Sequence, residues 1–453
     1  MSGYQSYTAY ASLWNESLPS HWSVLPMYAL AKEKSICGCM DLPLLSVYLD
    51  VGVIPFSAKA EKRTNVTSKD LSKYQRVDCG DFVLNNQQAW RGSVGISFDT
   101  GIVSPAYIVL SMNDMLNSRY ANYLLRSRIM VDQYLINSKS VGSIQRNIYW
   151  PALKRTSVLV PPRDEQDQIV RFLDWKVSSI NKLIRIRKRR IEELEAIKRS
   201  SIGYLVMGQT QSIPQRGTAV SWVKTIPAHW NEKSLIQVAE EQKIKNAGMV
   251  EDNLLSLSYG KIINKDIKTT DGLLPSSFEG YQIVHDGNII LRLTDLQNDH
   301  KSLRTGLVTQ TGIITSAYTC LNVRHNILPE YLQLQLHVAD LCKVFYGMGG
   351  GVRQSIGFKE IRKLVIAIPP VEEQQHILDS VHSIEKPINC AIQNSRDIIA
   401  GLEDLKMRLI SDTVTGKIDV RGIEIPEYEF VDEDIDNADE VMEQGVNEPL
   451  EEE

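Results

Sequence analysis

One stretch of this sequence occurs twice, first as Val160-Pro161-Pro162-Arg163-Asp164-Glu165-Gln166 and again as Ile368-Pro369-Pro370-Val371-Glu372-Glu373-Gln374. The two copies stand 208 residues apart, which is 368 minus 160. A second stretch keeps that separation, because Leu18-Pro19-Ser20-His21-Trp22 returns as Ile226-Pro227-Ala228-His229-Trp230. Two distant blocks with one offset indicate a duplicated unit, since unrelated chance matches would not share a spacing.

The two halves agree more loosely between these blocks. Gly80-Asp81-Phe82-Val83-Leu84 matches Gly287-Asn288-Ile289-Ile290-Leu291, a turn that leads into an apolar strand, at an offset of 207 (287 minus 80). Short β-branched runs bounded by Gly, Asp and Asn predict a mixed α+β module in each half. We expect one helix in each module, over about Arg119 to Gln133 and over about Pro329 to Cys342.

A long helix is predicted after each Pro-Pro pair, because proline lacks an amide hydrogen and favours an extended residue before it. Glu165 falls in the first turn of the first helix. Apolar residues then recur three, four or seven apart, a narrow stripe that is typical of coiled-coil seams. Arg187 and Lys198 interrupt the first stripe, and Pro387 interrupts the second, where it should kink the helix or split it in two. The stripes contain Leu173, Val177, Ile180, Ile184, Ile191, Leu194 and Leu205, then Ile377, Val381, Ile384, Ile388, Ile392, Ile399, Leu402 and Leu409.

The two long helices are expected to pair, because water would otherwise cover the apolar stripe of each. Antiparallel pairing would place the modules at opposite ends of a rod of about 60 Å, from roughly 40 residues at ~1.5 Å each. The predicted fold class is α+β, with two tandem modules each followed by a long helix, and with the helices paired as an antiparallel coiled coil. The expected boundaries are 1–162 and 210–370 for the modules, 163–209 and 371–417 for the helices, and 418–453 for an acidic tail.

The formal net charge of −5 hides an asymmetry along the chain. From Glu424 to Glu453 the sequence has 14 Asp and Glu and no Lys or Arg, so removing those 14 negative charges from −5 leaves +9 for the rest. A basic body favours a polyanionic partner. The tail has few large apolar residues, so we expect it to be disordered.

The bulk composition is that of an ordinary globular protein, with 43% hydrophobic and 23% charged residues. No apolar run approaches the roughly 20 residues that a membrane span needs, and Met1 to Tyr10 lacks the layout of a signal peptide. The six cysteines are scattered, and no second pair joins Cys37 and Cys39 to complete a zinc site. We therefore expect a cytoplasmic protein with reduced thiols and no metal.

The segment before the closing strand of each module carries residue types that read DNA bases. Ser140 to Ile148 in the first half corresponds to Gly349 to Ile356 in the second. Glycine lets a backbone approach a groove closely, and Arg, Gln and Asn side chains hydrogen-bond the edges of guanine and adenine. An ordinary flexible loop would tolerate the same residues. The candidates for base contact are Lys139, Gln145, Arg146 and Asn147, and in the second half Arg353, Gln354 and Ser355.

Two further groups are candidates for DNA contact. Asn85 to Arg91 faces Arg292 to Asn298, and within these segments Arg91 and Arg292 are the expected base contacts. The first long helix carries a run of cations in which Lys188 and Arg189 would contact phosphates. The alternative for that run is a solvated face whose cations balance the acids of residues 192–195.

Sites of catalysis are not evident in the sequence. It contains no G-x-x-x-x-G-K-[ST], G-x-G-x-x-G, H-E-x-x-H or G-x-S-x-G motif. Neither Pro-Pro pair stands in an Asn-Pro-Pro-Tyr arrangement, the usual site of adenine methyltransferases. The repeated His-Trp pairs are expected to be structural, with each Trp filling a core.

These features together resemble the specificity subunits of type I restriction-modification enzymes. The resemblance rests on the tandem Leu/Ile-Pro-x-His-Trp starts, the two Pro-Pro-x-x-Glu-Gln-x-x-Ile helix starts, and helix ends at Gly208-Gln209 and Gly416-Lys417. It spans the chain up to about residue 421. It implies two target-recognition domains, each reading one half of a bipartite target in double-stranded DNA, with the paired helices fixing the spacer.

The resemblance also implies partners for a subunit that is not itself catalytic. Two methyltransferase subunits would dock on it, and restriction subunits with a DNA motor would join them. S-adenosylmethionine, ATP and Mg²⁺ would belong to those partners, so no cofactor is expected in this chain. Two alternatives stay open at this point: a self-contained DNA-modifying enzyme with a diverged active site, and a coiled-coil scaffold without a DNA role.

Overall fold

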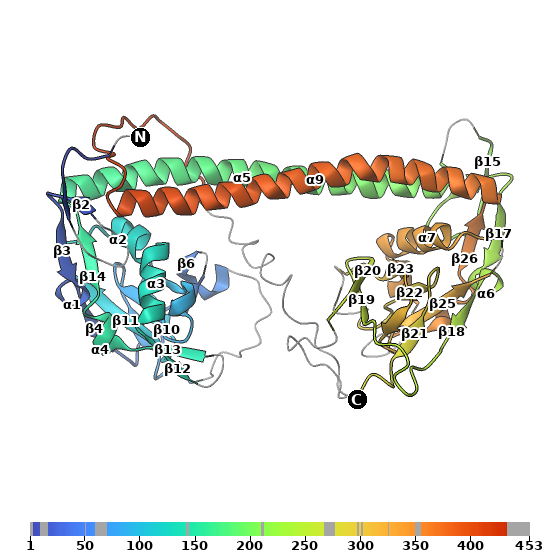
Figure 1. The fold of residues 1–453 in the computed structure, drawn as a ribbon, viewed down its shortest axis with the longest axis horizontal. Coiled ribbons are helices and arrows are strands. Elements are labelled where there is room, and N and C mark those ends of the chain that lie inside the picture. Colours follow the sequence, from blue (N-terminus) through green and yellow to red (C-terminus); the bar gives the residue numbers. More distant parts are fainter. Residues whose placement is uncertain are drawn as a thin grey trace. The chain divides into compact units, whose positions relative to one another are not determined.

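The computed structural model of this 453-residue chain describes residues 3–9, 17–49, 51–58, 70–141, 145–209, 213–266, 277–296, 299, 302–324, 326–348 and 355–432. It contains two compact units. The first unit includes the chain up to Arg189 and the returning segment from Ser395, and the second includes Arg190–Asn394. Each unit holds one α+β module together with parts of two long helices (Figure 1).

A four-stranded antiparallel sheet is the centre of the first module. Side chains alternate between its two faces, as they do along any β-strand. Phe82 and Leu84 belong to one buried cluster and Val83 to another, so both faces of the sheet are covered. In order across the sheet, the strands are β4 (Ala31–Lys34), β11 (Tyr107–Met112), β8 (Phe82–Asn85) and β9 (Val94–Ile96).

The first module has two helices on this sheet, α2 (Ser118–Leu125) and α3 (Arg128–Ile136). The prediction of one helix over Arg119 to Gln133 is therefore wrong. Ser127 adopts an extended backbone with ψ 152°, which ends one helix and starts the next. The break is stabilised by Tyr134, whose buried hydroxyl donates a 2.7 Å hydrogen bond to the carbonyl of the last residue of α2. Carbonyls at a helix end need such a partner, and propensity along the sequence does not reveal it.

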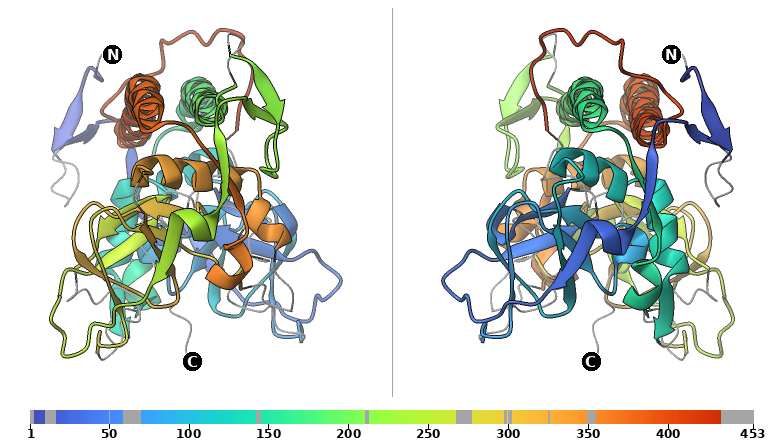
Figure 2. Two further views of the ribbon diagram at one scale, coloured as in Figure 1. Left: turned by 90° about the vertical axis from the view of Figure 1, so that its right-hand side faces the viewer. Right: turned by 90° about the vertical axis from the view of Figure 1, so that its left-hand side faces the viewer.

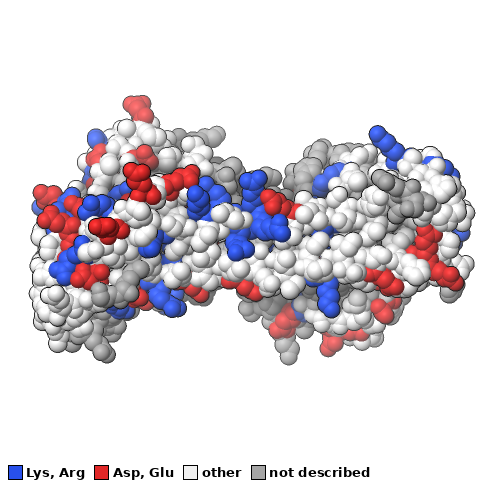
Figure 3. All heavy atoms as spheres, turned by 90° about the horizontal axis from the view of Figure 1, so that it is seen from above, with Lys and Arg blue, Asp and Glu red and all other residues white. Residues whose placement is uncertain are grey.

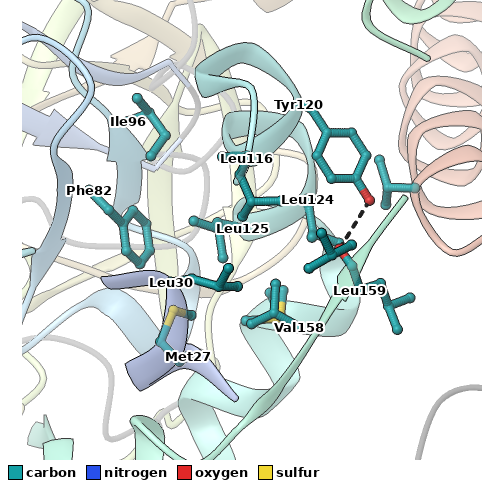
Figure 4. Packing of buried hydrophobic residues seen from close by; sticks show 14 of the residues in the cluster. Met27, Leu30, Phe82, Ile96, Leu116, Tyr120, Leu124, Leu125, Val158 and Leu159 are labelled. Atoms are coloured by element: carbon teal, nitrogen blue, oxygen red, sulfur yellow. Dashed lines mark hydrogen bonds between the residues drawn. The ribbon is translucent and has the colours of Figure 1, made fainter. Parts of the chain in front are cut away.

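Residues from the sheet, the helices and the closing strand share one core (Figure 4). The closing strand β14 (Ser157–Val160) pairs antiparallel with β3 (Ser23–Pro26). Tyr120 donates from its hydroxyl to the Leu159 carbonyl at 3.3 Å, which ties α2 to that strand. The core residues that Figure 4 labels are Met27, Leu30, Phe82, Ile96, Leu116, Tyr120, Leu124, Leu125, Val158 and Leu159.

The second module repeats this arrangement with the same strand order. Ile289 and Leu291 lie in one buried cluster and Ile290 in another, as their counterparts do in the first module. The strand predicted to match residues 82–84 is thus confirmed in its place in the sheet. Its helix, α7 (Pro329–Leu341), begins at the expected residue and ends one residue early. The sheet strands are β18 (Ala239–Gln242), β25 (Thr319–Val323), β22 (Ile289–Leu291) and β23 (Thr305–Leu307).

The remaining strands form two-stranded pairs around each sheet. In the first unit these elements are β1 (Tyr7–Ala9), β2 (Ser17–Pro19), α1 (Met27–Leu30), β5 (Leu45–Tyr48), β6 (Gly52–Pro55), β7 (Gln75–Val77), β10 (Gly101–Val103), β12 (Ser138–Val141), β13 (Gln145–Ile148) and α4 (Trp150–Leu153). In the second they are β15 (Gln215–Gly217), β16 (Thr225–Pro227), β17 (Asn231–Ser234), α6 (Leu235–Val238), β19 (Leu255–Ser258), β20 (Lys261–Asn264), β21 (Gln282–Val284), β24 (Gly312–Ile314), α8 (Phe358–Ile361) and β26 (Val365–Ile368). Short 3-10 turns are η1 (Phe56–Ala58), η2 (Ala89–Arg91) and η3 (Val344–Gly347).

Two long helices, α5 (Arg163–Val206) and α9 (Val371–Val414), lie side by side within each unit (Figure 2). In the first unit the start of α5 lies against the end of α9, where Ile169 and Val414 share one core cluster. In the second unit the end of α5 lies against the start of α9, where Val206 and Val381 share another. The predicted antiparallel pairing of the helices is confirmed. None of the described helices combines the length and the apolar composition that a bilayer crossing requires.

Pro387 lies inside α9, and the helix continues through it. Of the two predicted outcomes, a kink or a split, the split is therefore wrong. Lys198 of α5 bridges the position, because its ammonium lies 3.0 Å from Glu385 Oε1 and donates at 3.0 Å to Asn389 Oδ1. A residue that interrupts the apolar stripe of one helix thus holds both sides of the proline in the other. The hydrogen bond lost at one amide is outweighed by packing on both sides.

The tail is not disordered from its start. Residues 418–432 are described and pack on the first unit, with Val420 and Val431 buried. Gln168 of α5 donates to the carbonyls of Val420 at 3.0 Å and Ile423 at 2.8 Å. The prediction of disorder is wrong for this part, because a few apolar residues among the acids have a core to join. Residues 433–453 lie outside the described part of the chain.

Each long helix ends at a glycine with a left-handed backbone, Gly208 at φ +60° and Gly416 at φ +75°. The next residue donates its amide back to the helix in each case, from Gln209 to the Tyr204 carbonyl and from Lys417 to the Asp412 carbonyl, as in a Schellman motif. A Cβ on Gly208 would lie 2.5 Å from Pro227, and one on Gly416 would lie 2.6 Å from Pro19. The two Leu/Ile-Pro-x-His-Trp starts therefore pack on the ends of the long helices.

Substitution of these terminal glycines is expected to destabilise the unit that contains them. Gly208→Ala and Gly416→Ala should each lower the free energy of unfolding by at least about 1–2 kcal/mol, from the left-handed backbone alone. Gly203→Ala and Gly401→Ala are matched controls, because these helical glycines have nothing within 4 Å of a built Cβ. These control substitutions should raise the free energy of unfolding by roughly 0.5–1 kcal/mol. Denaturant midpoints measure both, and equal effects at all four positions would contradict the packing described.

Candidate nucleic-acid interface

The start of each long helix is held to its module by one carboxylate. In the first unit Glu165 is buried and accepts hydrogen bonds from Trp22 Nε1 at 3.0 Å and from Tyr4 Oη at 2.5 Å. His21 Nε2 lies 2.6 Å from its other oxygen, and because a carboxylate only accepts, that nitrogen donates. Burial, the hydrogen bond and the neighbouring Glu165 charge raise the pKa of Tyr4, so its hydroxyl stays protonated as a donor.

The second unit repeats this contact at the equivalent residues. Glu373 accepts from Trp230 Nε1 at 3.0 Å, and His229 Nε2 lies 2.8 Å from its second oxygen. Both Trp side chains are buried, as the repeated His-Trp pairs predict. We call the Glu, His and Trp of each unit the clasp. The two clasps explain why blocks 144 residues apart in the chain (165 minus 21) are repeated together.

The glutamine that follows each clasp carboxylate holds the module helix. Gln166 donates to the Pro161 carbonyl at 2.9 Å and accepts from the Asn117 amide at 2.7 Å, one residue before α2. Gln374 donates to the Pro369 carbonyl at 3.0 Å and accepts from the Leu328 amide at 2.8 Å, one residue before α7. Each Glu-Gln pair therefore orients a whole module on its long helix.

The first group of predicted base contacts forms a β-hairpin rather than a loop. Strands β12 and β13 pair with Lys139 opposite Asn147 and Ser140 opposite Arg146. The Lys139 ammonium lies 3.6 Å from the centre of the Tyr149 ring, and Arg146 Nη1 donates weakly to Ser138 Oγ at 3.4 Å. Gln145 lies at the outer end of β13. Residues 142–144, between the two strands, lie outside the described residues.

The structure brings the second group of the first module beside this hairpin. The Ile148 amide, at the end of β13, donates to the Asn86 carbonyl at 3.2 Å and to Asn86 Oδ1 at 2.9 Å. Arg91 ends η2 a few residues later, is exposed, and has its guanidinium 5.3 Å from the centre of the Trp90 ring. Two segments that the sequence suggested separately therefore form one surface.

The second module joins its own two segments through the same backbone bond. The Ile356 amide donates to the Leu293 carbonyl at 3.0 Å, and these residues match Ile148 and Asn86 at offsets of 208 and 207. Ser355 is exposed next to this bond, and Arg292 lies one residue before it on the other segment. Arg353 and Gln354 lie outside the described residues, as do residues 297 and 298.

Sequence reasoning missed a buried cation that shapes the second segment. The side chain of Arg304 is fully buried and donates to the carbonyls of Thr294 at 2.6 Å and of Asp299. Its backbone amide donates to Asp340 Oδ2 on α7 at 2.7 Å. Arg304 thereby holds the chain that follows Arg292 in a fixed course. A run such as Lys301-Ser302-Leu303-Arg304 suggests an exposed loop, so no local signal identifies this arginine.

Lys188 and Arg189 lie on α5, where part of the cation run is paired along the helix. Arg190 Nη1 lies 3.8 Å from Glu193 Oε2, and Arg199 Nη1 lies 3.9 Å from Glu195 Oε2. Such long ion pairs are expected on a solvated face. Within the described part of the chain, Lys188 has no ion pair. Figure 3 shows Lys and Arg side chains grouped over the paired helices. No group of metal-ligating side chains is found among the described residues.

The sequence matches a family model over residues 37–196 and 305–398, more than half of the chain. The model describes the type I restriction modification DNA specificity domain. This chain belongs to that family. The resemblance drawn from the repeated motifs is thus confirmed, and the matched segments include most of α5, the end of the second module and the first part of α9.

Known members are similar along most of the chain. A putative type I restriction enzyme MjaX specificity subunit from Methanocaldococcus jannaschii is 23% identical over 380 residues, covering 79% of this chain and 82% of the relative. A chain from a structural study of assembly and conformational transition of the type I R-M system has a TM-score of 0.59 at 14% identity, covering 88% of this chain and 99% of that one. The HsdS subunit of Thermoanaerobacter tengcongensis has a TM-score of 0.42 at 14% identity, with coverages of 88% and 98%.

The stability of this specificity-family chain is expected to depend on the protonation of Asp340. Burial raises the pKa of this carboxyl from 3.8 to about 6, and among the described residues its Oδ1 has no hydrogen-bond partner. The fold therefore favours the neutral acid, whose stabilising effect is complete below pH 3.8 and is lost as pH rises through about 6.

Asp340→Asn should remove this loss and stabilise the second unit at pH 7–8, by up to about 3 kcal/mol at 1.36 kcal/mol per pKa unit. Denaturant unfolding of both proteins between pH 4 and pH 8 measures the difference. Asp252→Asn, at an exposed position of the same module, is the control and should change little. Lower stability of Asp340→Asn at neutral pH would show that Arg304 requires the charged carboxylate.

Proposed function

We propose that this chain reads a two-part target in double-stranded DNA, one part with each module, as the non-catalytic specificity subunit of a type I restriction-modification complex. The observation that carries the proposal is the bond repeated in both modules, Ile148 to Asn86 and Ile356 to Leu293. It joins two segments whose framework is equivalent while their exposed residues differ. Two modules that recognise different DNA sequences with the same fold would need an equivalent framework and different exposed residues. Membership of the specificity family supports the same conclusion.

Base reading is assigned to polar and basic residues near these bonds in the sequence, of which Lys139, Arg91 and Ser355 are exposed. A two-stranded ribbon such as β12–β13 fits the major groove, where Arg pairs with guanine, and Asn or Gln pairs with adenine. In the first module the readers would be Arg146, Asn147, Gln145, Lys139 and Arg91. In the second they would be Arg353, Gln354, Ser355 and Arg292.

The long helices would set the spacing between the two parts and add affinity. Lys188 and Arg189 of α5 would contact phosphates of the unread spacer, which raises affinity without sequence preference. In this proposal the modules are residues 1–162 and 210–370, and the paired helices hold them a fixed distance apart.

Partner subunits would supply the chemistry. Two methyltransferase subunits would bring S-adenosylmethionine, and restriction subunits would bring ATP and Mg²⁺. Large exposed apolar side chains on the long helices support docking of this type, since such residues mark interaction surfaces when they gather. They include Leu183 and Ile186 on α5 and Leu405 and Met407 on α9.

The target is expected to consist of two short blocks separated by a gap of fixed length. Binding-site selection by the complex of this chain with its methyltransferase partner would show this directly. Methylation mapping of a genome with and without the chain should give the same two blocks. One continuous block would contradict the assignment of one reader to each module.

Substitution of single readers should affect one block at a time. Arg146→Ala should reduce discrimination at one position of one block by about 1–3 kcal/mol, and Arg353→Ala should do so in the other block. Lys188→Ala is the matched control, because loss of a phosphate contact weakens all sequences alike and lowers the salt slope by about one. Uniform weakening by Arg146→Ala would assign that residue to phosphate contact instead.

A further inference from the structure

The segment Ile418–Asp432, here called the strap, lies along the first part of α5. Ser178 donates from Oγ to the Glu429 carbonyl at 2.9 Å and accepts from the Val431 amide at 2.6 Å. Asn181 donates to the Val431 carbonyl at 3.2 Å. Together with the bonds from Gln168 described above, these contacts show that the strap runs in the same direction as α5.

The strap is packed as well as hydrogen-bonded. Ile423 and Ile425 contact the core of the first module, and the Arg119 guanidinium lies 5.6 Å from the centre of the Phe430 ring. The last ion pair before its end joins Glu429 to Lys182 at 3.0 Å. Near the end of the described chain, Val431 and Glu429 therefore lie against Asn181 and Lys182, at a defined place on α5.

The repeat shows that this contact belongs to one half only. The α5 residues under the strap, Gln168, Ser178 and Asn181, are buried. Their counterparts 208 residues later on α9, His376, Lys386 and Asn389, are exposed. Among the described residues, none of these three α9 side chains hydrogen-bonds to the segment that follows α5, so these particular bonds are not repeated in the second unit.

The face of α5 under the strap continues into a cationic stripe. Residues three or four apart lie on one face of a helix, so Ser178 and Lys182 are followed there by Arg185, Lys188 and Arg189. From Lys182 to Arg189 the helix rises only about 10 Å, at ~1.5 Å per residue. We call these four cations the basic stripe, and it begins where the strap ends.

The sequence after the strap is strongly acidic. Five acids, Glu433, Asp434, Asp436, Asp439 and Glu440, fall within eight residues of Asp432, and residues 433–453 contain no Lys or Arg. A flexible chain of eight residues has a root-mean-square span of roughly 15 Å, at about 5–6 Å times the square root of its length. That span exceeds the stripe's length of about 10 Å, so the acids can reach all four cations.

We propose that residues 433–440 bind the basic stripe of α5 and compete there with the phosphates of DNA. The strap delivers these acids to the stripe at an effective concentration in the mM range, which is typical of a short tether. Each exposed pair is weak and screened by salt, so a specific duplex displaces the acids while loosely bound DNA does not. The tail thus suppresses non-specific binding. That DNA is the competing ligand rests on the proposed function, but the contact between the tail and the basic stripe does not.

Zero-length carbodiimide coupling of the full chain tests the contact without DNA. Lys188 should form amide links to acids of residues 433–440, and these links should disappear at high salt or on addition of duplex DNA. Lys386 of α9 is the matched control, since it is an exposed lysine at the repeat equivalent of Ser178. Equal coupling to Lys188 and Lys386 would overturn the proposal whatever the chain recognises.

Charge neutralisation at constant length tests the competition. The variant Glu433→Gln, Asp434→Asn, Asp436→Asn, Asp439→Asn and Glu440→Gln, in complex with the methyltransferase partner, should bind non-specific duplex about tenfold more tightly at low salt. The gain should shrink to less than about twofold at high salt. Glu424→Gln with Glu427→Gln, in the strap ahead of the stripe, is the control and should change affinity little.

The outcomes separate this proposal from the proposed function. Specific DNA binding with no gain from neutralisation would overturn the competition and leave the reading of DNA intact. Coupling of the tail to Lys188 in a chain that binds no DNA even with its partners would reject the proposed function and retain the contact. A gain that persists when Arg185→Gln and Lys188→Gln remove half of the stripe would place the competition elsewhere and overturn the assignment to α5.

Discussion

The carboxylates of Glu165, which is buried, and Glu373, which is half-buried, connect each module to its long helix, and the remaining geometry depends on that connection. A carboxylate taken out of water is costly unless hydrogen bonds replace its hydration. The indole and imidazole donors of Trp22 and His21 supply these bonds in the first unit, and Trp230 with its neighbouring His supplies them in the second. The position also suits an acid, because the first turn of a helix attracts negative charge. These directional bonds, together with those of the glutamine that follows, orient each module on its helix.

Beyond the clasps, both modules share the same framework contacts, whereas their exposed residues differ. The glutamine after each carboxylate positions the module helix, and one backbone bond in each module joins the two candidate reading segments. These contacts use backbone atoms or motif side chains, so the exposed residues around them can change without cost to the framework. Arg304 shows how far such change goes, because among the described residues a fully buried guanidinium holds this segment only in the second module. In the proposed function, the specificity of each module can therefore diverge while its framework is maintained.

Basic and acidic residues are also separated along the chain. The body without the acidic tail is basic, and part of its cation run lies on α5 where the strap ends. The strap is held mainly by buried apolar residues and by hydrogen bonds from α5 side chains to its backbone, which salt weakens little, whereas an acid–stripe contact would be electrostatic and salt-sensitive. A firmly anchored strap followed by an acidic segment is the arrangement expected of a competitor that specific DNA can displace.

The sequence by itself determined the duplication, the two long helices, their pairing and the family. It could do so because prolines, helix-end glycines and buried Trp–Glu contacts tolerate few substitutes, so their spacing survives in the residues themselves. It also placed Arg146 and Asn147 beside a closing strand. Only the tertiary structure decided that Ser127 breaks a helix, that α9 continues through Pro387, and that the strap is ordered. Each of these outcomes depends on a partner distant in the sequence, such as Lys198 for the proline or α5 for the strap, and local pattern contains no information about distant partners.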